Sequence, residues 1–238
     1  MSQQDKQADT ISCLQPRLTA LQARIAELAC RRPGGGEVRL IAVSKTRPPE
    51  IMHEAYRAGI RLFGENRIQE LTAKVPAMPA DVEWHFIGHL QRNKARSAVG
   101  LADWIHAVDS LDLLHRIDRI AEDEGRSPRI LLQVNISGEG SKSGVAPDAC
   151  EELAAAAREC RHLHCMGLMT MAPWSAGKEE LHDIFGRLRH LRDRLEKELR
   201  MALPELSMGM SNDYEIAIAE GATMVRIGSA IFEPLPAK

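Results

Sequence analysis

The sequence has few aromatic residues, no excess of charge of one sign and no long apolar run. Phenylalanine, tryptophan and tyrosine make up 4% of its 238 residues, which leaves little surface for stacking on single-stranded bases. A net charge of -2 gives no reason to expect nucleic acid or an anionic membrane as a partner. No apolar run reaches the roughly 18 residues that a transmembrane helix needs. These absences favour an ordinary globular protein, with 44% hydrophobic and 27% charged residues.

A secretion signal and a paired-cysteine motif are also missing. The polar N-terminal stretch MSQQDKQADT has no signal-peptide core, so we expect a cytoplasmic protein. The cysteines are odd in number and none follows C-x-x-C spacing, which predicts free thiols rather than disulfides or a metal site. The five are Cys13, Cys30, Cys150, Cys160 and Cys165.

Short apolar segments of strand length alternate with amphipathic helical segments along the chain. This alternation predicts a parallel sheet, and eight units with no clear linker predict one closed (β/α)8 barrel of the TIM type. We expect a single domain over 1–238, with an extra N-terminal helix and disorder in 1–9. An open doubly wound sheet is the alternative, although no G-x-G-x-x-G motif follows the first strand. The expected strands are 38–44, 62–66, 83–88, 104–108, 129–135, 164–169, 205–208 and 223–227.

The expected helices have two features that the sequence leaves open. Apolar residues spaced by three and four predict a helix over 10–30, but Pro16 requires that it begin there or be kinked there. Ser110 and Gly125 are good boundaries for the helix between them. The other expected helices are 49–58, 67–75, 90–99, 147–160, 178–199 and 213–219.

Lys45 follows directly after the first expected strand. The run Ile41–Ser44 is apolar and small, and Pro48 and Pro49 follow shortly after the lysine. A lysine at the end of a buried strand is unusual without a task. We interpret Lys45 as the amine that holds an aldehyde cofactor as a Schiff base, with burial lowering its pKa. The alternative is a lysine whose stem lines the strand end while its amine reaches solvent.

Two late loops and one arginine could hold the rest of such a cofactor. Barrel phosphate sites commonly use the loops after strands seven and eight, which here are 209–212 and 228–230. Both offer glycine and serine, although each could be an ordinary turn. Arg226 lies inside the apolar eighth strand, where a guanidinium needs a partner. It could donate to a ring nitrogen or form a buried ion pair with Glu65.

The chain resembles the pyridoxal phosphate homeostasis protein family, whose fold is the alanine-racemase-like barrel. The resemblance covers nearly the whole chain, in order. The matching blocks are AVSKTRP at 42–48, FGENRIQE at 63–70, WHFIGHLQRNK at 84–94, VNISGEGSKSG at 134–144, GLMTM at 167–171 and LSMGMSNDYEIAIAEGATMVRIGSAIF at 206–232.

This resemblance implies a pyridoxal 5′-phosphate site and a role for each matched residue. Two departures are visible: His89 stands where many relatives have proline, and Ser229 stands where threonine is common. The serine keeps the hydroxyl that a phosphate needs, whereas the role of His89 is open. The resemblance implies Lys45 for the Schiff base, Asn66 near the ring, Ser211, Gly228 and Ser229 for the phosphate, Arg226 for the pyridine nitrogen and Ser207 at the same rim.

The expected function is storage, buffering or delivery of the cofactor with little or no turnover. Arginine cannot accept a proton from the ring nitrogen, which weakens the electron sink. Related racemases take a second base from an added domain, for which a chain ending at Lys238 has no room. Neither Tyr56 nor Tyr214 is an obvious substitute. The alternative is a small amino-acid racemase with an unrecognised second base.

Four further expectations concern cofactor transfer and association. Enzymes that need the cofactor could receive it from this chain, which we expect to be a monomer or weak dimer. Lys142, in the glycine-rich loop 137–144, could take the aldehyde from Lys45 and release it to acceptors, or it could be an exposed lid residue. The basic segment 91–96 could bind a protein partner or form a solvated helix surface.

Overall fold

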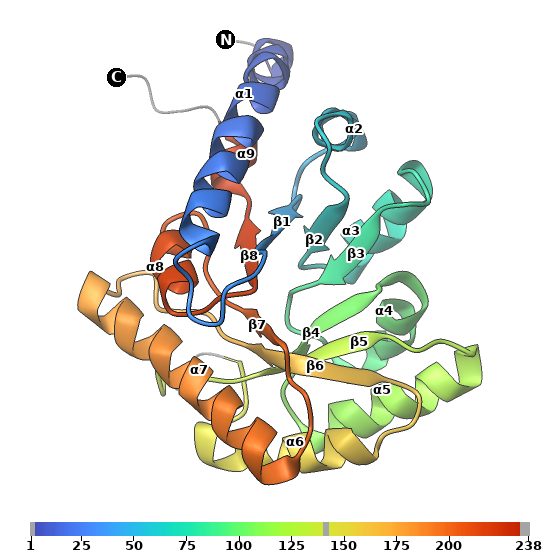
Figure 1. The fold of residues 1–238 in the computed structure, drawn as a ribbon. Helices are drawn as coiled ribbons and strands as arrows, with labels where there is room; N and C mark the ends of the chain where they lie inside the picture. Colours follow the sequence, from blue (N-terminus) through green and yellow to red (C-terminus); the bar gives the residue numbers. More distant parts are fainter. Residues whose placement is uncertain (1–2, 140–142, 234–238) are drawn as a thin grey trace.

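Eight parallel strands close into a barrel with helices around the outside (Figure 1). The computed structural model describes residues 3–139 and 143–233, with side chains from residue 14 onward. Each strand pairs with its neighbours in chain order, and β1 pairs with β8 to close the ring. The predicted closed barrel is therefore confirmed, and the open sheet is wrong. The strands are β1 (Arg39–Val43), β2 (Leu62–Glu65), β3 (Glu83–Phe86), β4 (Trp104–Val108), β5 (Arg129–Gln133), β6 (His164–Met169), β7 (Glu205–Ser207) and β8 (Met224–Ile227).

A helix follows every strand, and one additional helix precedes β1. That first helix lies against α2, α8 and α9. None of the helices within the described residues is long and apolar enough to cross a membrane. The α-helices are α1 (Gln3–Ala29), α2 (Pro49–Arg57), α3 (Ile68–Lys74), α4 (Ala95–Leu101), α5 (Leu111–Glu124), α6 (Cys150–Glu159), α7 (Lys178–Leu199), α8 (Tyr214–Ala219) and α9 (Ser229–Phe232), with 3-10 turns η1 (Val75–Ala77), η2 (Arg92–Lys94) and η3 (Pro147–Ala149).

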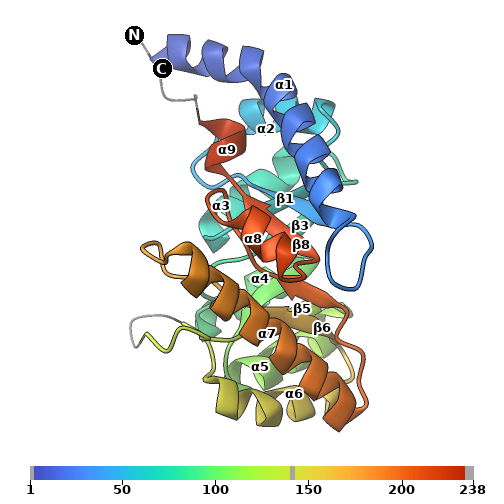
Figure 2. The same ribbon diagram turned by 60° about the vertical axis from the view of Figure 1, so that its left-hand side comes forward.

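Helix α1 continues through Pro16. Of the two readings of the sequence, a helix that begins at the proline is therefore wrong. Figure 2 shows the ribbon of α1 changing direction along its length, as expected where a proline removes one backbone hydrogen bond. The helix begins at Gln3 and so extends into the segment for which the sequence predicts disorder.

Three other helix boundaries can be compared with the local sequence signals that predict them. Ser110 accepts a hydrogen bond from the Leu113 N–H at 3.3 Å, and Gly125 has φ 59 at the other end of α5. Both predicted caps are confirmed. The helix predicted over 90–99 begins later, because η2 takes up Arg92–Lys94 and α4 starts only at Ala95.

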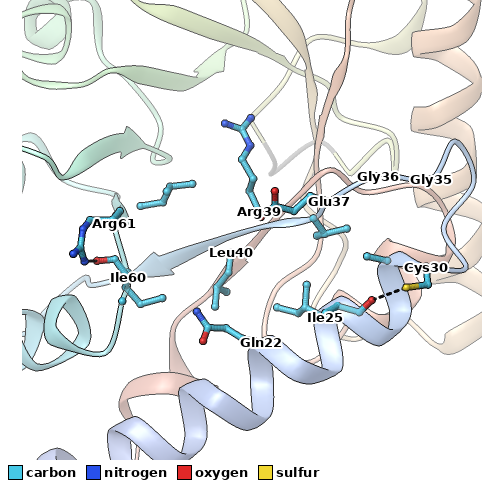
Figure 3. A pocket seen from close by; sticks show the side chains of 15 residues that line it. Gln22, Ile25, Cys30, Gly35, Gly36, Glu37, Arg39, Leu40, Ile60 and Arg61 are labelled. Atoms are coloured by element: carbon cyan, nitrogen blue, oxygen red, sulfur yellow. Dashed lines mark hydrogen bonds between the residues drawn. The ribbon is translucent and has the colours of Figure 1, made fainter.

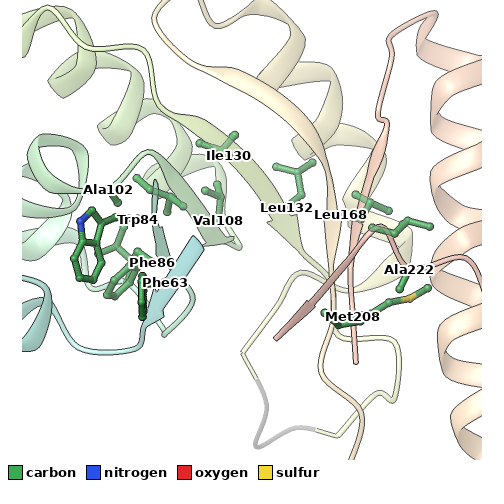
Figure 4. Close-up of a cluster of buried hydrophobic side chains, with 14 of the residues drawn as sticks. Phe63, Trp84, Phe86, Ala102, Val108, Ile130, Leu132, Leu168, Met208 and Ala222 are labelled. Atoms are coloured by element: carbon green, nitrogen blue, oxygen red, sulfur yellow. The ribbon is translucent and has the colours of Figure 1, made fainter. Parts of the chain in front are cut away.

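Alternate residues of each strand face the barrel interior and the surrounding helices. On β3, Trp84 and Phe86 join Phe63 in the apolar layer under the helices (Figure 4). His85 faces the other way, where its ring stacks on Trp104 with centroids 5.6 Å apart. The interior holds a separate small apolar cluster, made of Ile41, Trp104, Leu131, Met169 and Met224. The polar residues that remain in the interior therefore have apolar walls.

Candidate functional site

Lys45 lies in the turn that follows β1, and its side chain is exposed. The preceding Ser44 is fully buried, and the N–H of Arg47 bonds to the Ser44 carbonyl at 2.9 Å. The prediction that Lys45 is buried is wrong, because the strand ends before the lysine and the chain turns outward. The amine is open to a ligand, and the described residues give it no hydrogen bond or ion pair.

A buried cluster beneath this turn holds the backbone on both sides of Lys45. Lys74, only 6% exposed, donates to the Ser44 carbonyl at 2.9 Å and to carboxylates of Glu65 and Glu70, both at 2.7 Å. Glu70 also accepts from the N–H of Thr46 at 2.7 Å. Thr46 has φ 61, a left-handed conformation that is costly for a β-branched residue. The cluster therefore fixes the turn in a conformation that it would not favour alone.

The carboxyl groups of the cluster differ in their electrostatics. Burial raises the pKa of Glu65, against hydrogen bonds from Lys74 and Ser44. Burial also acts to raise the pKa of Glu70, but hydrogen bonds from Lys74 and Thr46 outweigh it and the net shift is downward. The sequence analysis missed Lys74 as a buried residue. Its spacing of four from Glu70 predicts an exposed helix pair as readily as a buried one.

Arg226 lies inside the barrel, 3% exposed, and forms no ion pair with Glu65. Its Nη1 donates to Ser207 Oγ at 2.6 Å, and its Nη2 donates to the Thr170 carbonyl at 2.9 Å. Burial lowers the pKa of Arg226 to about 10, opposed by the charge of Asp213. The arginine therefore stays charged at neutral pH and has guanidinium protons left over for a ligand.

The two glycine-containing loops meet at the same end of the barrel. The N–H of Ala230, in the first turn of α9 after β8, lies 3.4 Å from Ser211 Oγ in the loop after β7. A Cβ on Gly228 would lie 3.1 Å from the carbonyl oxygen of Val43, and Gly209 has φ 93. Glycine is thus used where the backbone passes close to β1 and where it turns. Ser229 begins α9 directly after this contact, a short helix that was not predicted from the sequence.

The side chain of Asn66 has a buried oxygen that a ligand could bind. Its side-chain oxygen is buried and has no hydrogen-bond partner within the described residues. Gly88 packs so tightly on this residue that a Cβ there would lie 2.1 Å from the Asn66 carbonyl oxygen. An unpaired buried acceptor is costly, so the amide is suited to a ligand group that can donate to it. Together with the spare Arg226 protons, this fits a polar ring bound at the mouth of the barrel.

His89 and the basic segment 91–96, which the sequence analysis singled out, lie next to carboxylate groups. His89 Nδ1 lies 3.7 Å from a carboxylate oxygen of Asp109, and burial raises the pKa of Asp109. Arg92 pairs with Asp112 at 2.7 Å, and Arg96 pairs with Asp123 and Glu124, so this basic surface is largely neutralised. Lys142 and the centre of its loop lie outside the described residues.

A cavity of about 800 Å³ lies at the opposite end of the barrel, and Figure 3 shows the side chains that line it. It opens between α1 and the starts of β1 and β2, beside Ile25, Leu40 and Leu62. Barrel active sites lie at the carboxyl ends of the strands, so this cavity is not the candidate site. Among the described residues there is no cluster of histidine, cysteine and carboxylate groups that could hold a metal, and Cys30, Cys150, Cys160 and Cys165 are free thiols.

Comparison with known proteins agrees with the fold and the family resemblance. The family model of the alanine racemase N-terminal domain matches residues 17–236. A pyridoxal phosphate homeostasis protein of Aquifex aeolicus is 43% identical over 219 residues, 91% of this chain and 96% of the relative. A protein of the same name from Pseudomonas aeruginosa is 42% identical over 228 residues, 93% of this chain and 96% of the relative.

Solved structures place the same fold in proteins of related and of distant sequence. PipY of Synechococcus elongatus, solved with PLP bound, is 39% identical and superposes with a TM-score of 0.83 over 92% of this chain and 99% of its own. An alanine racemase of Clostridium difficile is 13% identical, with a TM-score of 0.73 over 90% of this chain and 58% of its own. The second likeness shows the barrel fold alone.

Proposed function

This chain belongs to the pyridoxal phosphate homeostasis protein family, and from that premise we propose that it binds pyridoxal 5′-phosphate and holds it as a Schiff base on Lys45. In this role the protein stores, buffers or delivers the cofactor, with little turnover of its own. The PLP-bound structure of PipY, at 39% identity, supports the choice of ligand. The observation that carries the proposal is the pairing of an exposed amine at Lys45 with a buried, charged Arg226 at the same end of the barrel.

Each part of the cofactor has candidate partners. The deprotonated amine of Lys45 attacks the aldehyde carbon, and water leaves as the Schiff base forms. Ser211, Gly228 and Ser229 lie where the two glycine-containing loops meet, and we assign them to the phosphate. The buried oxygen of Asn66 lacks a partner and is suited to a donor on the ligand.

Arg226 is assigned to the pyridine nitrogen, and Ser207 lies beside it at the same rim. When bound, the cofactor supplies an electron-poor ring whose strength as an electron sink depends on the group at its nitrogen. Arg226 has donors only, so it leaves that nitrogen unprotonated. Ser207 and the Thr170 carbonyl orient the guanidinium. A weak sink suits a protein that holds the aldehyde more than one that transforms amino acids.

The availability of bases also favours a carrier. Tyr56 donates its hydroxyl proton to Asp81 at 2.7 Å, outside the barrel mouth, and the Tyr214 hydroxyl lies 3.3 Å from Glu215. Neither tyrosine is free to serve as a second base. The racemase alternative therefore needs a base other than these tyrosines, and His89, near Asp109 at the rim, is the candidate that a variant can test. We propose that the recipients of the cofactor are enzymes that require it.

An absorbance titration tests the proposed function. Adding pyridoxal phosphate to the purified protein should produce the visible band of a Schiff base, and Lys45→Ala should abolish that band. The exposed Lys178→Ala is the matched control and should leave it intact. The same band in Lys45→Ala would overturn the assignment.

Deuterium exchange separates the carrier from the racemase. The loaded protein is incubated with L- and D-amino acids in deuterated water, and deuterium at Cα is measured. The proposal predicts no incorporation above that of free pyridoxal phosphate. Incorporation at enzymatic rates that His89→Ala removes would support the racemase instead.

A further inference from the structure

A line of hydrogen bonds runs through the barrel interior, from Arg226 near the mouth to Glu83 at the start of β3. Arg226 Nη1 lies 2.6 Å from Ser207 Oγ, which lies 3.0 Å from His106 Nδ1. His106 Nε2 lies 2.9 Å from His85 Nδ1, and His85 Nε2 lies 3.1 Å from Glu83 Oε1. Ser207, His85 and His106 are fully buried. The line therefore passes from one end of the barrel to the other without solvent at its middle members.

When both imidazoles are neutral, the carboxylate acceptor at Glu83 fixes the direction of every bond in the line. Arg226 can only donate, and the Glu83 carboxylate can only accept. Ser207 accepts from the arginine and has one proton left, which it donates to His106 Nδ1. His106 then carries its proton on Nε2 and donates to His85, whose own Nε2–H donates to Glu83. This is the one arrangement with both imidazoles neutral in which each contact has one donor and one acceptor.

The surroundings of the two histidines favour this neutral arrangement. Burial lowers the pKa of His85 and lowers the pKa of His106 well below its ordinary value. Trp104 stacks on His85 and donates its own N–H to Glu83 Oε1 at 3.0 Å. An additional proton on either imidazole would place a positive charge in this apolar interior, which burial disfavours.

The line adds a second acidic group, Glu83, to the surroundings of Arg226, on which the charge of Asp213 already acts. The direct hydrogen-bond partners of Arg226 are a hydroxyl and a backbone carbonyl, and a buried charge without compensation is expensive. Asp213 acts on it only through space. Hydrogen bonds that all point the same way polarise one another. Glu83 also pairs with Arg129 at 2.9 Å and lies 3.8 Å from Arg39, and these cations offset part of its charge. The effect that reaches Ser207 Oγ is therefore the polarisation of the aligned hydrogen bonds, which strengthens the acceptor that holds the guanidinium.

We propose that Glu83 is the remote counter-charge of Arg226, connected to it through His85, His106 and Ser207, and that this line sets how strongly Arg226 donates to the cofactor ring nitrogen. The four are positioning residues, because none needs to touch the reacting aldehyde. The inference rests on the proposed function for its effect on the ring, whereas the line itself is a property of the protein without ligand.

The first test needs no ligand. Protein labelled with ¹⁵N in its histidines is studied by NMR at neutral pH, where the long-range ¹⁵N–¹H pattern reports which ring nitrogen carries the proton. His85 and His106 should both be neutral with the proton on Nε2. Ser207→Ala removes the donor to His106 Nδ1 but keeps Glu83, so the Nδ1 resonance of His106 should move while the proton stays on Nε2. A proton on Nδ1 of either residue, or a charged His85, would overturn the directed line.

The second test uses pyridoxal phosphate labelled with ¹⁵N in its ring and two matched carboxylate variants. Glu205 lies at the same end of the barrel as Glu83 and pairs with Arg39 at 2.7 Å, but it has no line to Arg226. Glu83→Gln keeps an acceptor for His85 but removes the charge. Its bound ring resonance should move to lower frequency, the direction of stronger donation by Arg226, whereas Glu205→Gln should stay at the wild-type position.

The outcomes separate this inference from the proposed function. Equal shifts in the two variants, or no shift in Glu83→Gln, would refute the remote counter-charge while leaving cofactor binding intact. A ring resonance identical to free pyridoxal phosphate in the wild-type protein would instead contradict the proposed function. The histidine tautomers would then still decide whether the line exists. If Glu83→Gln fails to fold, Ser207→Ala with bound cofactor provides the same shift by breaking the line at its other end.

Discussion

At the scale of single residues, two lysines have the opposite exposure to the one that their local sequence predicts. Lys45 follows a buried strand, which predicts burial, yet its side chain is exposed. Lys74 has the i,i+4 acidic partner typical of a surface helix, yet it is 6% exposed beneath the turn of Lys45. Both outcomes depend on where the loop after β1 meets α3, which no local pattern contains. Arg226, by contrast, was predictable as a buried arginine because its strand is apolar on both sides.

Lys74→Met tests the cluster that holds the Lys45 turn. The substitution keeps the apolar stem but leaves Glu65 and Glu70 without their shared cation, which should destabilise the protein by about 3–5 kcal/mol. It should also slow Schiff-base formation, because Thr46 loses its support. Thermal denaturation and the rate of the visible band provide the two readouts. The exposed Lys178→Met is the control, and an unchanged melting temperature and rate in Lys74→Met would refute the role of the cluster.

At the scale of elements, segments with a clear apolar pattern between breaking residues were predicted best. The bounds of β4, β6 and α7 agree with the sequence prediction at both ends, since each has clear alternation or a long amphipathic face between breakers. The helix at 90–99 was predicted less well, because η2 precedes α4 and has no distinct sequence signal. Close approaches between strands could not be predicted, since they need the register of the sheet.

Gly167 in β6 shows such an approach. A Cβ at this position would lie 1.8 Å from the backbone oxygen of Glu205 in β7, and the glycine has φ 154. We expect Gly167→Ala to separate β6 from β7 and to destabilise the protein by more than about 3 kcal/mol. The control is Gly100→Ala in α4, where no atom lies within 4 Å of the added Cβ. That variant should be stabilised by about 0.5–1 kcal/mol. Equal melting temperatures for the two would contradict the close approach.

At the scale of the whole molecule, four charged residues close the barrel at the end opposite the site. They are the first residues of four alternate strands, and their charges alternate in sign around the ring. Arg39 lies 2.7 Å from Glu205 and 3.8 Å from Glu83, and Arg129 lies 2.9 Å from Glu83. From sequence these residues are only polar strand ends separated by tens of positions. Barrel closure was predictable from alternation, but this ring is a consequence of closure and could not be predicted before it.

The ring and the buried histidines predict loss of stability in acid. His85 and His106 have pKa values lowered below the ordinary 6.5, so stability should fall as the pH drops below about 6.5, where the unfolded chain takes up protons that the fold excludes. Hydrogen bonding from His85, helped by Arg129, lowers the pKa of Glu83 from 4.5 to about 2, so a further loss follows below pH 4.5.

Thermal denaturation of the ligand-free protein from pH 8 to pH 3 measures this dependence. Glu83→Gln should remove the lower part of the curve and keep the upper part, because it leaves the histidines buried. The carboxylate contributes on the order of 2 kcal/mol to that lower part. A melting temperature that stays constant down to pH 5 would contradict the neutral, buried state of the two histidines.

The central claim is that Lys45 holds the aldehyde of pyridoxal phosphate, and reductive trapping tests it most directly. The loaded protein is treated with borohydride, digested and mapped by mass spectrometry. We predict one main adduct at Lys45, and its loss in Lys45→Ala without transfer of the full yield to another lysine. A main adduct at a different lysine in the wild-type protein, or an undiminished adduct in Lys45→Ala, would contradict the claim.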